Sequence, residues 1–330
     1  MIYIALNVIF NAFILAIILL IGADFMHIKP HIAWCLGYVI AALLAIIGYT
    51  KFATSTIGLF IPRRNMVGRE INKLEPLFQE VINKTNNEYN TNYKLVDFNI
   101  KVSDNKIVNT FAIGYNTIII NRGAFEKLTN EQLQAVLAHN MGCLYYRDSV
   151  RSTALLFSSL GSRVIMGIYG IYLAFATIVS NSFKGKNSKI LALISWLPLL
   201  VFLPVIILNF IGAKLFNILN LKASRDAEYR ADAFAINLGY KADLISALEV
   251  LDAITIHDNS FVAKLMSSHL PTMSRIGAIE DEKIATPNLV TPFVATNSSD
   301  IGGNSEVLRL GAILCLGAVI WCYFGMVCVG

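Results

Sequence analysis

The chain is short of charged residues. Only 15% of its 330 residues are Asp, Glu, Lys or Arg, against roughly 25% in an ordinary soluble domain. Together with a hydrophobic content of 55%, this excludes a disordered chain, a basic nucleic-acid-binding module and a plain cytosolic enzyme. The formal net charge of +5 is small for this length. We attribute it to loop charges that orient a membrane protein, not to a nucleic-acid partner.

Cysteine is also scarce, and the five present do not form a disulfide framework. Their number is odd, and four of them lie in apolar runs, where cysteine acts as a small buried hydrophobic residue. The exception is Cys143, which lies at helical spacing from a histidine. The sequence also has no internal repeat and no low-complexity tract.

Long apolar runs, by contrast, are abundant. A transmembrane helix needs about 20 mainly apolar residues. Five runs approach or reach that length, at residues 2–21, 33–49, 164–179, 190–211 and 310–329. The first has neither the basic n-region nor the small-residue cleavage site of a signal peptide, so we interpret it as a membrane span. The third and fourth form either two full crossings or a hairpin that does not fully cross.

Basic residues near the ends of the runs predict the orientation in the lipid bilayer. Lys51, Arg63 and Arg64 follow the second run, which places the polar region 51–152 in the cytoplasm. Three lysines between the third and fourth runs oppose this orientation. We keep it because two crossings or none both leave the candidate site residues on one side of the membrane.

The polar region 51–152 has the pattern of a helix, strands and a second helix. Pro76 marks the first turn of a helix or a kink. Residues 98–102 alternate between apolar and polar side chains, and residues 117–121 follow a turn, so both segments are predicted strands.

The second helix of this region carries the candidate site. Thr129 and Gln132 have the spacing of a capping box, and apolar residues then recur with helical period. His139 and Cys143 are four residues apart, so they project from one face of the helix. Imidazole nitrogen and thiolate sulfur are both good zinc ligands.

A third ligand is predicted in residues 224–232, Ser-Arg-Asp-Ala-Glu-Tyr-Arg-Ala-Asp. This segment should open another helix, with Glu228 and Asp232 on one face. Two ligands from one helix and a distant Glu, with the fourth position left for water, are the layout of a catalytic zinc site.

These motifs resemble those of the HtpX-type membrane zinc metallopeptidases, relatives of the CAAX prenyl endopeptidases. Residues 109–114, Asn-Thr-Phe-Ala-Ile-Gly, are similar to the family's Asn-Ala-Phe-Ala-x-Gly segment. Residues 224–232 match its Ser-Arg-x-x-Glu-Tyr-x-Ala-Asp motif. Residues 268–271 (Ser-His-Leu-Pro), with Arg275 and Ile276, are similar to its Ser/Thr-His-Pro-Pro…Arg-Ile element. The order and spacing of these segments carry the resemblance more than any one of them.

The resemblance implies a mainly α-helical multi-pass membrane protein with a zincin-like α+β metallopeptidase domain, made of a small sheet and a metal helix. It implies one zinc ion, held by His139, Cys143 and Glu228, and protein or peptide substrates in membrane-protein quality control. The implied location is a bacterial-type inner (cytoplasmic) membrane, with this domain facing the cytoplasm. The implied organisation is two transmembrane helices in 1–50, the first part of the metallopeptidase-like domain in 51–152, two hydrophobic segments in 153–218, the second part in 219–306, and a C-terminal transmembrane helix in 307–330.

The chain departs from the family pattern at two functional positions. The family has His-Glu-x-x-His, whereas this chain has His139-Asn140-x-x-Cys143. In the family the Glu takes a proton from zinc-bound water, and such general-base catalysis contributes roughly 10²–10⁴-fold. The Asn140 side chain has no titratable group. A Cys143 thiolate beside the Glu228 carboxylate would put two negative charges on the metal where the family has one, which weakens it as a Lewis acid.

Three further residues belong to the predicted site. Asp232 accepts a hydrogen bond from a metal-bound histidine, or is a helix-surface carboxylate. Arg225 pairs with an acidic neighbour or holds the substrate backbone. His269 lines the cleft or lies in a surface loop.

Two functions stay open. In the first, the chain is an impaired zinc metallopeptidase whose strand 117–121 pairs with the substrate backbone. In the second, it is a non-catalytic pseudoprotease that binds client or regulatory proteins. A transporter or channel is disfavoured, because the five apolar runs contain almost no ionisable residues.

Overall fold

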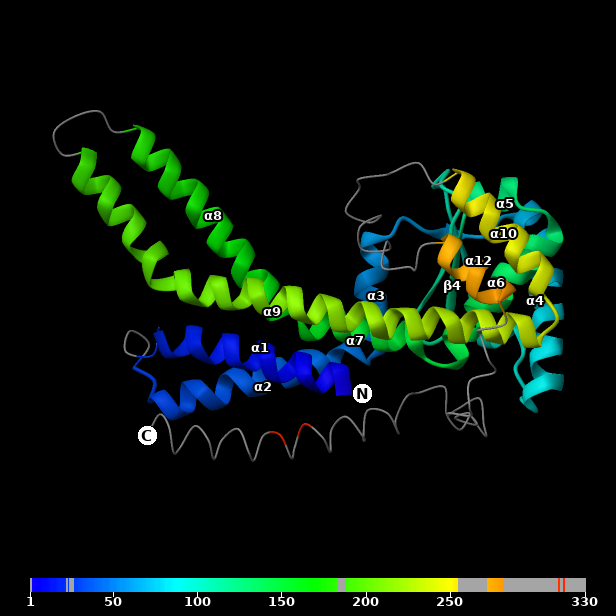
Figure 1. Ribbon diagram of the computed structural model, residues 1–330, viewed down its shortest axis with the longest axis horizontal. Helices are drawn as coiled ribbons and strands as arrows, with labels where there is room; N and C mark the ends of the chain where they lie inside the picture. The colour runs from blue at the N-terminus through cyan, green and yellow to red at the C-terminus, as the bar shows by residue number, and fades with distance from the viewer. Residues whose placement is uncertain are drawn as a thin grey trace. The chain divides into compact units, whose positions relative to one another are not determined.

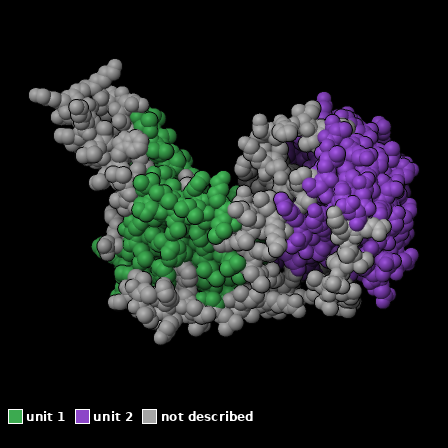
Figure 2. All heavy atoms as spheres, in the orientation of Figure 1, with its two compact units in different colours: residues 1–48, 154–220, 305–330 green, residues 49–153, 221–304 purple. Residues whose placement is uncertain are grey.

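The computed structural model describes residues 2–21, 23, 27–182, 188–254, 272–281, 314 and 317. The chain divides into two compact units (Figure 2). The first comprises residues 1–48, 154–220 and 305–330, and the second comprises residues 49–153 and 221–304. Most of the fifth apolar run lies outside the described residues, and so does His269.

The first unit is built from apolar helices. In the described part of the chain, α1 (Ile2–Ile21) and α2 (Pro30–Gly48) are the two helices long and apolar enough to cross a membrane. The two helices approach closely at Gly37. A Cβ atom there would lie 2.6 Å from the backbone nitrogen of Ala16, so this contact is possible only because residue 37 is glycine.

Two longer helices occur later in the sequence, and Figure 1 labels both. α8 (Leu160–Ser182) and α9 (Ser188–Asn237) contain the third and fourth apolar runs. The runs are helical as expected. Whether these two helices cross a membrane stays a prediction.

The segment 224–232 does not open a helix of its own, so that prediction was wrong. It lies inside α9, which continues without a break to Asn237. Ser224 and the charged residues after it have the composition of a helix start. However, residues 213–237 contain no glycine or proline that would end the preceding helix. Glu228 and Asp232 still lie one turn apart on one face.

The second unit contains a four-stranded sheet of order β1-β2-β4-β3. Its strands are β1 (Arg64–Asn65), β2 (Asn99–Ser103), β3 (Thr110–Ile113) and β4 (Thr117–Asn121). β4 pairs with β2 in parallel and with β3 in antiparallel fashion. β4 has the predicted bounds, and β2 lies one residue further on than predicted. β1 and β3 were not predicted.

Helices cover both faces of the sheet. On one face, Ile118 and Ile120 join a large apolar core that includes side chains of α4 (Gly68–Tyr89) and α6 (Asn130–Tyr145). On the other face, Ile119 packs in a smaller cluster beside Ile57 of α3 (Lys51–Phe60). All five residues of β4 are buried in consequence. Figure 1 shows β4 between α3 and α6.

β4 therefore cannot pair with a substrate, and the prediction that it does is wrong. Both of its backbone edges already bond to neighbouring strands. A peptide that adds to a sheet needs a strand with an unpaired edge. In the described sheet the strands at the two edges are β1 and β3.

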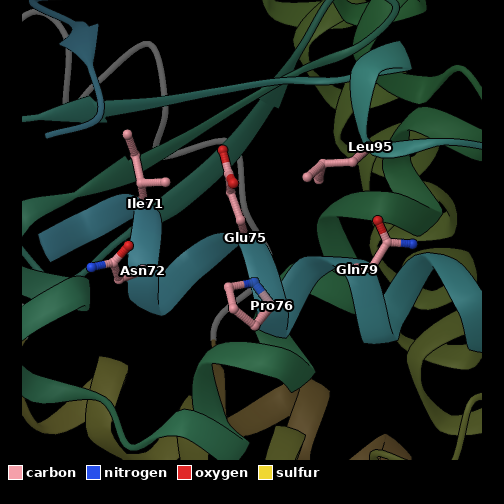
Figure 3. A pocket seen from close by; sticks show the side chains of 6 residues that line it. All are labelled: Ile71, Asn72, Glu75, Pro76, Gln79 and Leu95. Carbon is pink, nitrogen blue, oxygen red and sulfur yellow. The ribbon is translucent and has the colours of Figure 1, made fainter. Parts of the chain in front are cut away.

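Pro76 lies inside α4, whose helix continues on both sides of it. Proline has no N–H, so the carbonyl of Asn72, four residues earlier, loses its helical partner. A surface hollow opens here, lined by Ile71, Asn72, Glu75, Pro76, Gln79 and Leu95 (Figure 3). No residue of the predicted site lines it.

α6 begins at the predicted capping box. The side chain of Gln132 accepts from the Thr129 N–H at 3.0 Å, and the Thr129 hydroxyl accepts from the Gln132 N–H at 3.3 Å. The helix then approaches α9 at Gly142. A Cβ atom there would lie 2.9 Å from Cβ of Phe234 and 3.1 Å from Cα of Ala231. This glycine sets how closely the two helices of the candidate site pack.

We predict that Gly142→Ala lowers the free energy of unfolding by about 1–3 kcal/mol, the usual cost of overpacking a core. Thermal unfolding of the detergent-purified protein, followed by circular dichroism, measures it. The control is Gly277→Ala in α12 (Thr272–Glu280), where an added Cβ meets nothing within 4 Å. There alanine should be neutral or stabilising by up to about 1 kcal/mol. Equal effects of the two substitutions would contradict the packing argument.

Candidate functional site

Five side chains from three helices of the second unit meet in one cluster. They are His139 and Cys143 of α6, Glu228 and Asp232 of α9, and Arg275 of α12. Cys143 is partly exposed, and the other four are buried. We call this group the His139 cluster.

His139 is oriented by a carboxylate. Its Nδ1 lies 2.7 Å from Oδ1 of Asp232, which is fully buried. Because a carboxylate is an acceptor, we assign the ring proton to Nδ1. The other ring nitrogen, Nε2, faces Glu228 and Cys143. It lies 3.6 Å from Oε2 of Glu228 and 3.8 Å from Sγ of Cys143.

Arg275 completes the cluster. Its guanidinium donates to both carboxylate oxygens of Asp232, at 2.5 and 2.9 Å. Its Nη1 also lies 3.4 Å from Oε2 of Glu228. Burial alone would raise the pKa of Asp232, but the charges of Arg275 and His139 outweigh it and hold the pKa below its usual value. Asp232 is therefore an ionised carboxylate at neutral pH.

Arg275, and not Arg225, is the arginine of the His139 cluster. Arg225 is exposed on α9 and is not brought to the cluster. Arg275 had been noted only as part of a family element. A better signal was available: a buried carboxylate on an apolar helix face needs a cation, and Arg275 stands at the start of another amphipathic segment.

The thiol of Cys143 points into the protein, although the residue is partly exposed. Burial, and next the negative charge of Glu228, raise its pKa well above the usual range. A bound zinc ion deprotonates a thiol that coordinates it, so this pKa does not decide whether Cys143 is a ligand.

Asn140 links α6 to the sheet. Its side-chain nitrogen donates to the hydroxyl of Thr110 at 2.7 Å and to the carbonyl of Val136 at 2.8 Å. Both of its amide hydrogens are thereby used. Asn140 is 2% exposed, so this side chain is held in place.

Thr110 begins β3, an edge strand of the sheet that the described residues form. Asn109 accepts a hydrogen bond from the Asn121 N–H, which fixes the alternation of the β3–β4 ladder. By that alternation the N–H and C=O groups of Thr110 and Ala112 point away from β4. The side-chain carbonyl of Asn109 accepts from the Thr110 N–H at 2.8 Å. Ala112 therefore presents an N–H and a C=O in the position where another strand could bond.

Comparison with known proteins now identifies the family. The sequence profile of Peptidase family M48 matches residues 72–283. The chain belongs to this family. It is 27% identical over 199 residues to Protease HtpX of Alcanivorax borkumensis, covering 53% of this chain and 62% of that protein. It is 26% identical over 194 residues to Protease HtpX of Shewanella halifaxensis, covering 52% and 63%. The chain thus spans somewhat under two thirds of the length of these M48 relatives.

A solved structure, that of Ste24p from S. mikatae, aligns with a TM-score of 0.41 and 16% identity. It covers 80% of this chain and 61% of that one. The predicted HtpX-type membership is confirmed by the M48 match and the HtpX relatives.

M48 membership implies zinc, and the residues present do not fit it well. Ligand atoms around a tetrahedral zinc lie roughly 3.3–3.7 Å apart. The His139–Glu228 and His139–Cys143 separations of 3.6 and 3.8 Å come near this. Yet no three His, Cys, Asp or Glu side chains within the described ranges are grouped so that they could hold a metal ion. The guanidinium of Arg275, 3.4 Å from Oε2 of Glu228, is a further obstacle. The ligand roles of His139, Cys143 and Glu228 stay a prediction.

We predict that Arg275→Met lowers the free energy of unfolding by about 3–5 kcal/mol at neutral pH, because it leaves buried carboxylates without their cation. In the native protein Asp232 has a depressed pKa. It therefore contributes stability that is present above its unfolded pKa of about 3.9 and is lost as the pH falls through the folded value. In the variant, burial dominates and raises that pKa, so protonation in acid relieves the penalty. The gap between the two proteins should shrink as the pH falls below about 4.

Thermal unfolding over a pH series measures this gap. The matched control is Arg225→Met, at an exposed position of the same residue type, which should change stability by less than about 0.5 kcal/mol. A pH-independent gap, or equal losses at both positions, would mean that the Arg275–Asp232 pair does not hold the cluster.

Proposed function

We propose that this M48 chain is a membrane-anchored protein that binds extended segments of client proteins without cutting them efficiently. Two apolar helices, α1 and α2, support the anchor. The polar unit would face the cytoplasm at a bacterial-type inner membrane. Clients would be membrane or misfolded proteins, the substrate class that HtpX-type resemblance implies.

One observation carries the proposal. At the position of the family's general base stands Asn140, whose amide hydrogens are bonded to Thr110 and Val136. An amide cannot take a proton from water at neutral pH. Loss of a general base alone costs roughly 10²–10⁴-fold in rate. A Cys143 thiolate beside Glu228 would also weaken a bound zinc ion as a Lewis acid.

Zinc, where it binds in this family, polarises the scissile carbonyl and activates water. In this chain His139, Glu228 and Cys143 are the side chains that could approach such an ion. The remaining residues have roles that need no metal. Asp232 and Arg275 orient His139, and the edge of β3 offers backbone bonds.

Client binding would use the edge of β3. An extended segment that pairs there forms main-chain hydrogen bonds, which give affinity with little dependence on sequence. This suits a protein whose clients share exposed, unfolded backbone. The alternative function, an impaired metallopeptidase that still cuts slowly, uses the same edge and differs only in turnover.

We predict that Asn140→Glu combined with Cys143→His raises both zinc content and peptide hydrolysis. The wild-type protein should hold well under one zinc per chain, and its hydrolysis should be at least about 100-fold below that of the doubly substituted protein. Elemental analysis and a casein cleavage assay on detergent-purified protein measure the two quantities. Adding Glu228→Ala to the doubly substituted protein should abolish the gain.

A stoichiometric zinc in the wild-type protein, together with casein cleavage that Glu228→Ala removes, would favour the metallopeptidase alternative. If the double substitution gains zinc but no cleavage, the cleft has diverged beyond these two residues, and the non-catalytic function is strengthened.

We also predict that Ala112→Pro weakens binding of an unfolded client at least tenfold. Proline removes the N–H that points away from β4, so the β3–β4 ladder itself is unaffected. Ala112→Ser keeps the N–H and should bind as the wild-type protein does. Fluorescence anisotropy with a labelled, reduced and carboxymethylated protein measures affinity. If Ala112→Pro binds normally and unfolds at the wild-type temperature, then β3 is not the client edge.

A further inference from the structure

Thr110 and Asn140 form a buried hydrogen bond between the edge strand and the helix of the His139 cluster. The donor is Nδ2 of Asn140, the acceptor is the Thr110 hydroxyl, and the distance is 2.7 Å. Thr110 is 8% exposed and Asn140 is 2% exposed. The two residues are 30 positions apart in the sequence. The bond is thus a tertiary contact inside the second unit.

Both partners differ from the motifs that the rest of the chain resembles. Thr110 stands where the Asn-Ala-Phe-Ala-x-Gly segment has Ala, and Asn140 stands where His-Glu-x-x-His has Glu. An alanine has no hydroxyl to accept the Asn140 amide. The departure at position 140 is therefore hydrogen-bonded to the departure at position 110.

The bond acts on β3, an edge strand of the described sheet. β3 pairs with β4 on one side, and the described residues place no further strand on the other. Its start is held by Asn109, which accepts from the Thr110 N–H, and by Asn140 of α6, which donates to the Thr110 hydroxyl. An edge strand that is already ordered loses less conformational entropy when a peptide pairs with it.

We propose that Thr110 and Asn140 are a positioning pair, which fixes β3 in the conformation that receives an extended client segment. The inference rests on the proposed client-binding function. The effect of the pair on the order of β3, however, can be measured without a client. Asn140 then has a structural role in place of the proton transfer that the family's Glu performs. Its hydrogen bond to the Thr110 hydroxyl holds the β3 edge in place.

The test is a double-mutant cycle on the full chain with Thr110→Val and Asn140→Leu. Two readouts are used: backbone hydrogen exchange at β3, and the Kd for a fluorescein-labelled peptide of alternating valine and threonine. Each single substitution should speed exchange at Ala112 and raise the peptide Kd by about tenfold, which corresponds to the loss of one buried hydrogen bond. The double substitution should be no worse than either single one. Thr110→Ser keeps the hydroxyl, so its hydrogen exchange at β3 and its peptide Kd should match those of the wild-type protein.

The matched control is Thr85→Val. Thr85 is a fully buried threonine in α4 whose hydroxyl donates to Val81 at 2.8 Å. It should lower the unfolding temperature without changing exchange at β3 or the peptide Kd. If Thr110→Val behaves like this control, or if the two single effects simply add, then the pair has no positioning role and the proposal is overturned.

The two proposals fail separately. If the wild-type protein does not bind the peptide, the client-binding function is wrong, and hydrogen exchange at β3 still tests the positioning role of Thr110 and Asn140. If the peptide binds and the double-mutant cycle shows no coupling, the client-binding function is supported and the positioning role is wrong.

Discussion

The interior of the second unit depends on the hydrogen bonds and ion pairs that the Asp232 carboxylate makes. This carboxylate sits on α9 with no solvent exposure, and it accepts hydrogen bonds from His139 of α6 and from Arg275 of α12. Three helices therefore meet at one charge. To separate any of them would leave a buried ion without its partner, which is among the most costly changes a protein interior can undergo. The orientation of His139 follows from this. With Nδ1 committed to Asp232, Nε2 faces Glu228 and Cys143.

Much of this arrangement could be predicted from the sequence. The bounds of β4 and the capping box at Thr129 follow from local patterns. The meeting of His139 with Glu228 and Asp232 joins distant segments, and it was expected from the resemblance to the family. Strand order was not predictable in this way, because side-chain alternation says which residues share a face and not which strands are neighbours. The Ile118–Ile120 run did contain a clue. A strand that is apolar on both faces is covered on both, and such strands tend to be central.

Two other differences from expectation have a common cause. Arg225 was expected to pair with an acidic neighbour or to hold the substrate backbone, whereas the cation that reaches the buried carboxylates is Arg275, far along the chain. β3 was missed because four residues are too few to show a period. In both cases the deciding contact joins distant segments. The hydrogen bond between Asn140 and Thr110 has the same property, since it joins residues 30 positions apart.

The position of Arg275 has a consequence for how the protein is made. It lies 43 residues after Asp232 and 136 residues after His139. During synthesis, the sheet, α6 and α9 are all complete before Arg275 leaves the ribosome. Until then Asp232 has an imidazole for a partner but no cation, so α9 is not yet locked onto α6. The second unit therefore closes last at α12. A nascent chain stalled before this point would expose the very helix faces that a protease or chaperone recognises in unfinished proteins.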